Sequence, residues 1–76
     1  MQNIYILYGT ECCHLCDEAK AILRLAGIEA GYIDIAKDDD LLELYGVRIP
    51  VLKRVDTGTE LGWPFDAQAV SRFLAL

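Results

Sequence analysis

The sequence has no run of basic residues and no long hydrophobic segment. Seven Lys and Arg residues stand against twelve Asp and Glu residues, which gives a net charge of −5. Nucleic acid and anionic membrane surfaces bind clustered positive charge, so neither is expected as a partner. No apolar stretch approaches the roughly 20 residues that span a bilayer, and the start Met1-Gln2-Asn3 lacks the basic region of a signal peptide. We therefore expect a cytoplasmic protein.

The sequence also lacks internal repeats, low-complexity tracts and linkers. With 76 residues, of which 54% are hydrophobic and 25% charged, it has the composition of a globular domain and not of a disordered chain. A chain of this length buries only about 60% of its unfolded surface. We expect one small domain over residues 1–76, a monomer with no deep cofactor crevice.

Cysteine is scarce but clustered. The three cysteines are Cys12, Cys13 and Cys16, all within five positions. An odd number of neighbouring cysteines does not form a framework of disulfides between distant loops. In a reducing compartment, such a cluster indicates redox catalysis or metal binding.

The hydrophobic pattern predicts an α/β fold with the element order βαβαββα. A continuous apolar run predicts a buried strand, helical spacing of Leu15, Ala19 and Ile22 predicts an amphipathic helix, and the turn Asp56-Thr57-Gly58 joins two strands into a hairpin. The first two strands flank a helix and should be parallel. These elements fit one four-stranded mixed sheet with helices on both faces. Strands are predicted over 4–8, 30–35, 50–55 and 59–61, and helices over 14–26, 41–45 and the residues that follow Asp66.

Cys13-His14-Leu15-Cys16 is a Cys-x-x-Cys motif at the junction of the first strand and the first helix. The unpaired N–H groups and the positive dipole end of a helix N-terminus favour a thiolate, so Cys13 is the expected nucleophile. Cys16 lies one turn further along the same face. It can attack a mixed disulfide on Cys13 and release the reduced substrate.

Several segments together resemble the glutaredoxin-like proteins of the thioredoxin fold, most closely the short bacterial ones. They are Tyr8-Gly9-Thr10-Glu11-Cys12-Cys13-His14-Leu15-Cys16, Ile49-Pro50-Val51-Leu52, Glu60-Leu61-Gly62 and Asp66. The resemblance implies a thiol–disulfide oxidoreductase with Cys13 attacking and Cys16 resolving. It also implies no bound cofactor, glutathione as a co-substrate, and as partners a disulfide-containing protein or a flavin-dependent disulfide reductase.

The same resemblance implies a substrate site around the motif. Ile49-Pro50 is similar to the family's cis-proline, where the backbone of the preceding residue pairs with a substrate peptide or with glutathione. Gly62 and Asp66 match the turn and the capping aspartate that meet the γ-glutamyl end of glutathione. Asp66 is equally interpreted as a plain helix cap.

The sequence departs from the family at several of these positions. His14-Leu15 stands between the cysteines in place of Pro-Tyr, Thr10 takes the place of a basic residue, and Trp63 takes that of a glycine. The carboxylates Glu11, Asp17 and Glu18 surround the motif and should oppose an anionic tripeptide. Arg48 and Lys53 are the remaining candidates for pairing a substrate carboxylate, and Arg48 is the better placed.

Two residues of the motif keep alternatives open. Protonated His14 would stabilise a Cys13 thiolate by charge, and its other interpretation is an exposed spacer. Cys12 is a free bystander, a regulatory thiol or a metal ligand. The competing functions are an iron–sulfur or metal-binding glutaredoxin-like module and a non-catalytic thioredoxin-fold interaction domain. We expect no metal on this chain alone, because adjacent residues in one turn do not reach four tetrahedral corners.

Overall fold

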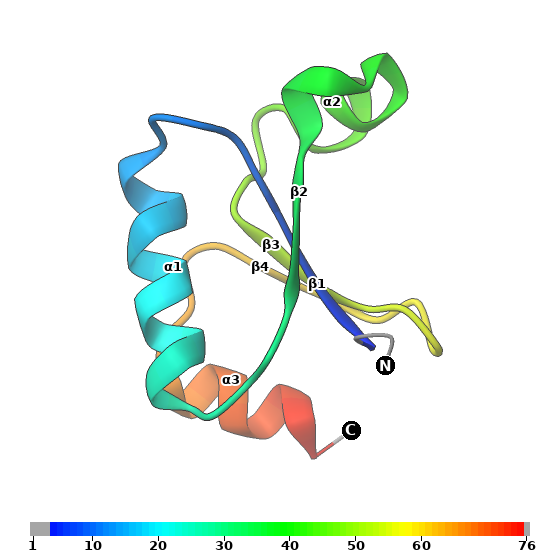
Figure 1. Cartoon of the computed structure of the whole chain (residues 1–76). Helices are drawn as coiled ribbons and strands as arrows, with labels where there is room; N and C mark the ends of the chain where they lie inside the picture. The colour runs from blue at the N-terminus through cyan, green and yellow to red at the C-terminus, as the bar shows by residue number, and fades with distance from the viewer. Residues whose placement is uncertain (1–3, 76) are drawn as a thin grey trace.

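A computed structural model describes residues 4–75 (Figure 1), so Met1-Gln2-Asn3, on which the signal-peptide expectation rests, lies outside the described residues. The predicted order βαβαββα is confirmed. The elements are β1 (Tyr5–Gly9), α1 (His14–Leu25), β2 (Gly31–Asp34), the 3-10 turn η1 (Ile35–Lys37), α2 (Asp39–Tyr45), β3 (Val51–Arg54), β4 (Glu60–Gly62) and α3 (Ala67–Leu74).

Element boundaries differ from the prediction by one or two residues, each for a local reason. The second strand was expected to reach Ile35, but it ends at Asp34, whose carboxylate accepts a hydrogen bond of 2.9 Å from the backbone N–H of Ala36 and starts η1. α2 begins earlier than expected because the carboxylate of Asp38 caps it.

The four strands form one mixed sheet in the order β2-β1-β3-β4. β1 is parallel to β2 and antiparallel to β3, and β3 is antiparallel to β4, as the pattern predicted. In this register Tyr8 lies opposite Val51, and Val51 lies opposite Gly62. The end of β1, the start of β3 and the end of β4 therefore meet at one end of the sheet.

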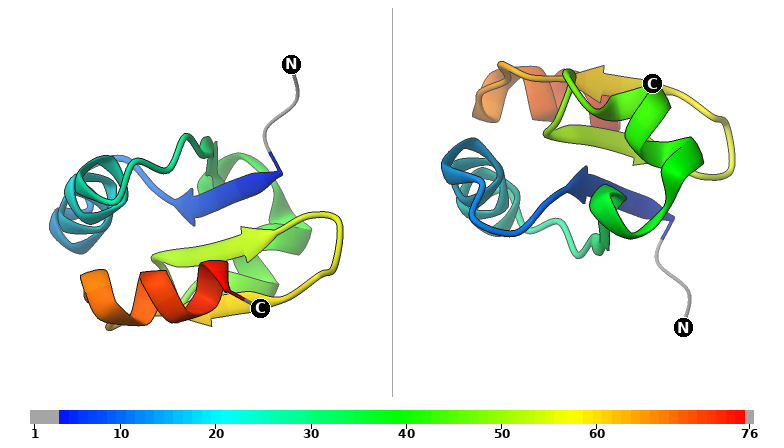
Figure 2. Two further views of the ribbon diagram at one scale, coloured as in Figure 1. Left: turned by 90° about the horizontal axis from the view of Figure 1, so that it is seen from below. Right: turned by 90° about the horizontal axis from the view of Figure 1, so that it is seen from above.

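Helices cover both faces of the sheet, again as predicted. α1 and α3 lie toward one side of the strands and α2 toward the other (Figure 2). Neighbouring residues of a strand point to opposite faces, so Leu7 packs in the layer of α1 and α3 while Tyr8 packs in the layer of α2. The buried residues of the first layer are Leu7, Ala19, Leu23, Leu52, Phe65, Val70 and Phe73. Those of the second are Tyr8, Ile35, Tyr45 and Val51.

One core prediction is wrong. Leu15 was expected on the inward stripe of the first helix, but its side chain is 42% exposed. The buried positions of α1 are Cys16, Ala19 and Leu23, which fall at helical spacing on a neighbouring face. Cys16 thus takes the core position assigned to Leu15, and the motif is anchored through its second cysteine.

Candidate functional site

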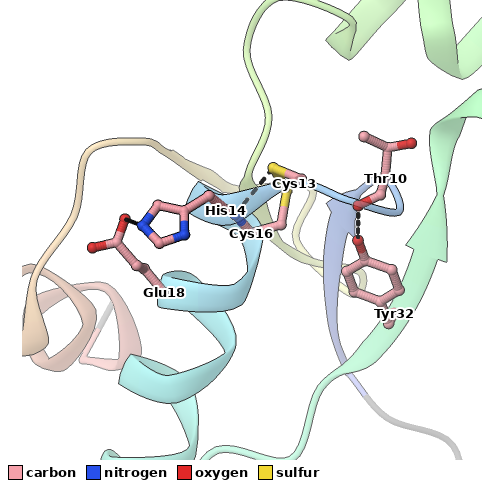
Figure 3. The surroundings of a disulfide bond; sticks show 6 residues. All are labelled: Thr10, Cys13, His14, Cys16, Glu18 and Tyr32. Atoms are coloured by element: carbon pink, nitrogen blue, oxygen red, sulfur yellow. Dashed lines mark hydrogen bonds and ion pairs between the residues drawn. A yellow bond between two sulfur atoms is a disulfide. The ribbon is translucent and has the colours of Figure 1, made fainter.

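The Cys-x-x-Cys motif lies at the end of the loop that connects β1 to α1 and in the first turn of α1. Cys13 is the N-cap of α1, with extended backbone angles, and the helix begins at His14. The Sγ atom of Cys13 accepts a hydrogen bond of 3.1 Å from the backbone N–H of Cys16 (Figure 3). This places the sulfur of Cys13 against the positive end of the α1 dipole, where a thiolate is stabilised.

Cys13 and Cys16 form a disulfide, with their Cα atoms 5.1 Å apart. Their burial is unequal, since Cys16 is 0% exposed and Cys13 is half-buried. An attacking thiolate has to approach along the sulfur–sulfur axis from an open side. Of the two cysteines, Cys13 is the more accessible. This agrees with the prediction that Cys13 is the nucleophile of the reduced protein.

Gly9 lets the buried sulfur approach the end of β1, a feature that sequence reasoning missed. A Cβ atom on Gly9 would lie 2.8 Å from Sγ of Cys16 and 2.6 Å from the hydroxyl of Tyr32. The Tyr32 hydroxyl in turn donates a hydrogen bond of 2.9 Å to the backbone carbonyl of Thr10 (Figure 3). The Nζ atom of Lys20 lies 3.9 Å from the centre of the Tyr32 ring. The absence of a side chain at Gly9 therefore allows Cys16 and Tyr32 to pack directly against β1.

The carboxylates near the motif act on Tyr32. Burial first, and then the charges of Asp34, Asp17 and Glu11, raise the pKa of its phenol. Asp17 comes from α1 and Glu11 from the loop before it, and both were among the acidic residues predicted around the motif. Asp34 of β2 was not predicted there, and Glu18, which was, lies beside His14.

The two residues of the motif with open alternatives, His14 and Cys12, are both exposed. Nε2 of His14 lies 3.9 Å from a carboxylate oxygen of Glu18, and the imidazole is 89% exposed. Figure 3 shows the ring directed toward Glu18, on the side away from the disulfide. Charge stabilisation of Cys13 by His14 therefore stays a prediction. Cys12 is an exposed free thiol with a positive φ of 59°.

The Ile49–Pro50 peptide bond is cis, as the resemblance implies. Pro50 is buried, and the backbone N–H of Ile49 donates to the carbonyl of Tyr45 at 3.1 Å. Because Val51 lies opposite Tyr8, the segment Arg48-Ile49-Pro50 enters β3 at the same end of the sheet where β1 runs into the motif. A second cis bond, between Trp63 and Pro64, was not predicted.

Arg48 is not free for a ligand in this structure. Its guanidinium lies 3.1 Å from one carboxylate oxygen of Glu60, and the other oxygen accepts a hydrogen bond of 2.5 Å from the Tyr45 hydroxyl. Burial and the bond to Glu60 raise the pKa of Tyr45 to about 12. The bond from Tyr45, helped by Arg48, lowers the pKa of Glu60. The Tyr45 ring is stacked on Tyr8 at 4.5 Å between centres.

This cluster predicts a pH-dependent contribution of Glu60 to stability. Because its pKa lies below the ordinary 4.5, the stabilisation is present above that value and is lost as the pH falls through the folded-state pKa. At pH 7 the Glu60→Gln variant should be less stable by about 1 kcal/mol, since the side chain is part exposed and screened. Urea unfolding at pH 7 and pH 3 measures the difference.

The difference between wild type and Glu60→Gln should shrink at pH 3. Glu29→Gln, an exposed residue outside the cluster, serves as the control. An equal difference at both pH values would contradict the assignment.

Of the remaining candidates, Gly62 lies at the same end of the sheet, and Asp66 follows it in the chain. Gly62 pairs with Val51 and is exposed, with open space where a Cβ would be. Asp66 caps α3, its carboxylate accepting a hydrogen bond of 2.8 Å from the backbone N–H of Ala69. The cap interpretation of Asp66 is therefore confirmed. Trp63 is half-buried and packs edge-on against Phe65, with ring centres 5.0 Å apart.

No helix within residues 4–75 is long and apolar enough to cross a bilayer. Within the same range, no group of three or more His, Cys, Asp or Glu side chains is arranged to hold a metal ion.

Comparisons with known proteins place the chain in a family. Residues 5–75 match the model of the Glutaredoxin-like domain (DUF836). No curated protein sequence matches the chain. The X-ray structure of protein XcR50 from X. campestris is 40% identical, with a TM-score of 0.86 over 93% of this chain and 95% of that one. The solution structure of Ne2328 from Nitrosomonas europaea is 32% identical, with a TM-score of 0.80 over 96% and 92%. The chain, with a thioredoxin-like fold and a cysteine pair that fits a redox function, belongs to the glutaredoxin-like family.

Proposed function

We propose that this protein is a thiol–disulfide oxidoreductase that reduces disulfides through Cys13 and Cys16. The observation that carries the proposal is the disulfide itself, with one sulfur at the helix N-terminus and the other fully buried. A dithiol arranged in this way has one sulfur for attack and a second one beside it for resolution.

The reaction starts from the reduced pair. The Cys13 thiolate attacks one sulfur of a substrate disulfide, a new S–S bond forms to Cys13, and the other substrate sulfur leaves as a thiolate that takes a proton from water. Cys16 then loses its proton and attacks Sγ of Cys13. This step closes the Cys13–Cys16 disulfide and releases the second substrate thiol. Two electrons pass from the protein dithiol to the substrate, which gains two protons.

The oxidised protein is returned to the dithiol by an external donor. Two equivalents of a thiol such as glutathione, or one dithiol of a flavin-dependent disulfide reductase, supply the two electrons. The first donor thiolate attacks the accessible sulfur of Cys13, and Cys16 leaves. We propose this cycle for a cytoplasmic monomer that acts on protein disulfides.

Trapping of the mixed disulfide tests this function. The Cys12→Ser/Cys16→Ser variant, mixed with 2-hydroxyethyl disulfide, should accumulate one mercaptoethanol adduct on Cys13 by intact mass. The matched Cys12→Ser/Cys13→Ser variant should form no adduct on the buried Cys16. Equal labelling of the two variants, or an adduct that persists when both motif cysteines are present, would contradict the proposal.

A further inference from the structure

Arg48 is the positively charged residue next to the cis-proline, where the resemblance implies a substrate site. It comes directly before Ile49–Pro50, and β3 then pairs with the end of β1 that leads into the motif. A guanidinium at this point would pair with a carboxylate of a ligand held along that segment. Arg48 is half exposed, so solvent does reach it.

The guanidinium of Arg48 is already paired with the carboxylate of Glu60. The carboxylate of Glu60 contacts Arg48 at 3.1 Å through one oxygen and holds Tyr45 through the other. In the β3–β4 ladder Glu60 lies opposite Lys53, the second candidate cation, whose charge also acts on it. The Glu60 side chain, 27% exposed, thus pairs directly with Arg48, the better placed of the two candidates for a substrate carboxylate, and lies opposite the other, Lys53.

The other positive side chains do not replace them at the motif. Lys20 lies over the ring of Tyr32, and the charges of Asp34, Asp17 and Glu11 act on the phenol of the same residue. The remaining four are Arg24 in the last turn of α1, Lys37 in η1, Arg54 paired with Asp56, and Arg72 in the last turn of α3. Around Tyr32, next to the motif, three negative charges therefore act together with one positive side chain, and that side chain is itself engaged with the Tyr32 ring.

We propose that Glu60 is a specificity-determining residue of this exchange site. By pairing with Arg48 it withdraws the one anion-binding side chain beside Ile49–Pro50, so the site selects neutral and cationic disulfides over anionic ones such as glutathione disulfide. This inference rests on the proposed function and names its substrate class. The carboxylates around the motif strengthen the same selection, because like charges repel an anionic substrate over the Debye length of about 10 Å.

Three small disulfides of different charge test the proposal. Cystamine is cationic, 2-hydroxyethyl disulfide is neutral and 3,3′-dithiodipropionate is anionic. The rate constant for oxidation of the reduced protein by each is measured for wild type and Glu60→Gln at low ionic strength. The ratio of variant to wild type cancels the different leaving-group reactivities of the probes. Glu60→Gln should raise the rate constant for the anionic probe about fivefold relative to the neutral one, which is what one exposed ion pair can contribute.

Two controls separate this effect from a change in net charge or in folding. Asp56→Asn removes the same charge from the far end of the β3–β4 hairpin, where Asp56 pairs with Arg54, and should change all three ratios equally. Adding Arg48→Gln to Glu60→Gln should cancel the gain. In unmodified protein, raising the salt concentration should speed the anionic probe relative to the cationic one.

The outcomes distinguish the two proposals. If reduced wild type does not react with the neutral probe, the proposed function fails, and the selectivity fails with it. If the neutral probe reacts but the ratio for Glu60→Gln is the same for all three charges, the function stands and the role of Glu60 is refuted. A gain for Asp56→Asn equal to that for Glu60→Gln would also refute it.

Discussion

Replacing Cys13 by serine is expected to lower disulfide-exchange turnover on the order of a thousandfold or more. A serine hydroxyl is not ionised near neutral pH and forms no bond to sulfur, whereas the buried Cys16 is closed to substrate. The fold should survive, because serine is among the best N-cap residues and can accept the N–H of Cys16 as the thiol does. Turnover of 2-hydroxyethyl disulfide, with thermal unfolding under reducing conditions, measures both effects.

Cys12→Ser provides the matched control for this variant. Cys12 is an exposed thiol directly beside Cys13 but outside the disulfide. Its replacement should leave turnover within about a factor of two of wild type. If Cys13→Ser kept more than a tenth of the activity, the attacking thiol would have to be another residue.

Replacing Gly9 by alanine should destabilise the protein by about 1–3 kcal/mol, the range for overpacking a filled site. The added methyl would lie 2.8 Å from the buried sulfur of Cys16 and 2.6 Å from the Tyr32 hydroxyl. The tyrosine hydroxyl that stands in the way donates a hydrogen bond to the backbone carbonyl of Thr10, and a shift of the ring strains that bond. Cys16 is fully buried on α1 and has no room to shift, so the strain falls on the contacts between β1, Cys16 and Tyr32.

Gly62→Ala is the control for this prediction. Gly62 also lies in the sheet, but a Cβ there would meet nothing within 4 Å. Urea unfolding should therefore show a change within about 0.5 kcal/mol for Gly62→Ala. Equal effects of the two substitutions would show that backbone freedom, and not contact with Cys16, decides the cost at Gly9.

The fold was predictable because its signals are local. A continuous apolar run, a change to helical spacing at His14 and turn residues at Asp56–Gly58 each mark one element, and the βαβ rule then orders the first strands. The placement of Cys13 at a helix start follows from the same local pattern. The misplaced Leu15 has a simple cause. Helical spacing alone does not distinguish two neighbouring faces of α1, and Cys16, which is fully buried and packs as a core residue, lies on the face that faces inward.

The partners of Arg48 were not predictable from the sequence. Its pairing with Glu60 depends on the register of β3 and β4 and on where α2 places Tyr45. No local pattern specifies these distances, because the residues are 12 and 15 positions apart in the chain. For the same reason the contact between Tyr32 and Thr10 was missed. The one sequence signal for it is a tyrosine in the second strand, which pairs with the strand before the motif.

The most direct test of the account is a redox titration of the thiols. The protein is equilibrated without oxygen in a series of glutathione buffers, quenched with an alkylating agent and weighed intact. Of the three cysteines, all should be labelled at the reducing end and one, Cys12, at the oxidising end, with peptide mapping that shows a Cys13–Cys16 disulfide. Three labelled thiols across the whole series would contradict a redox role for this pair.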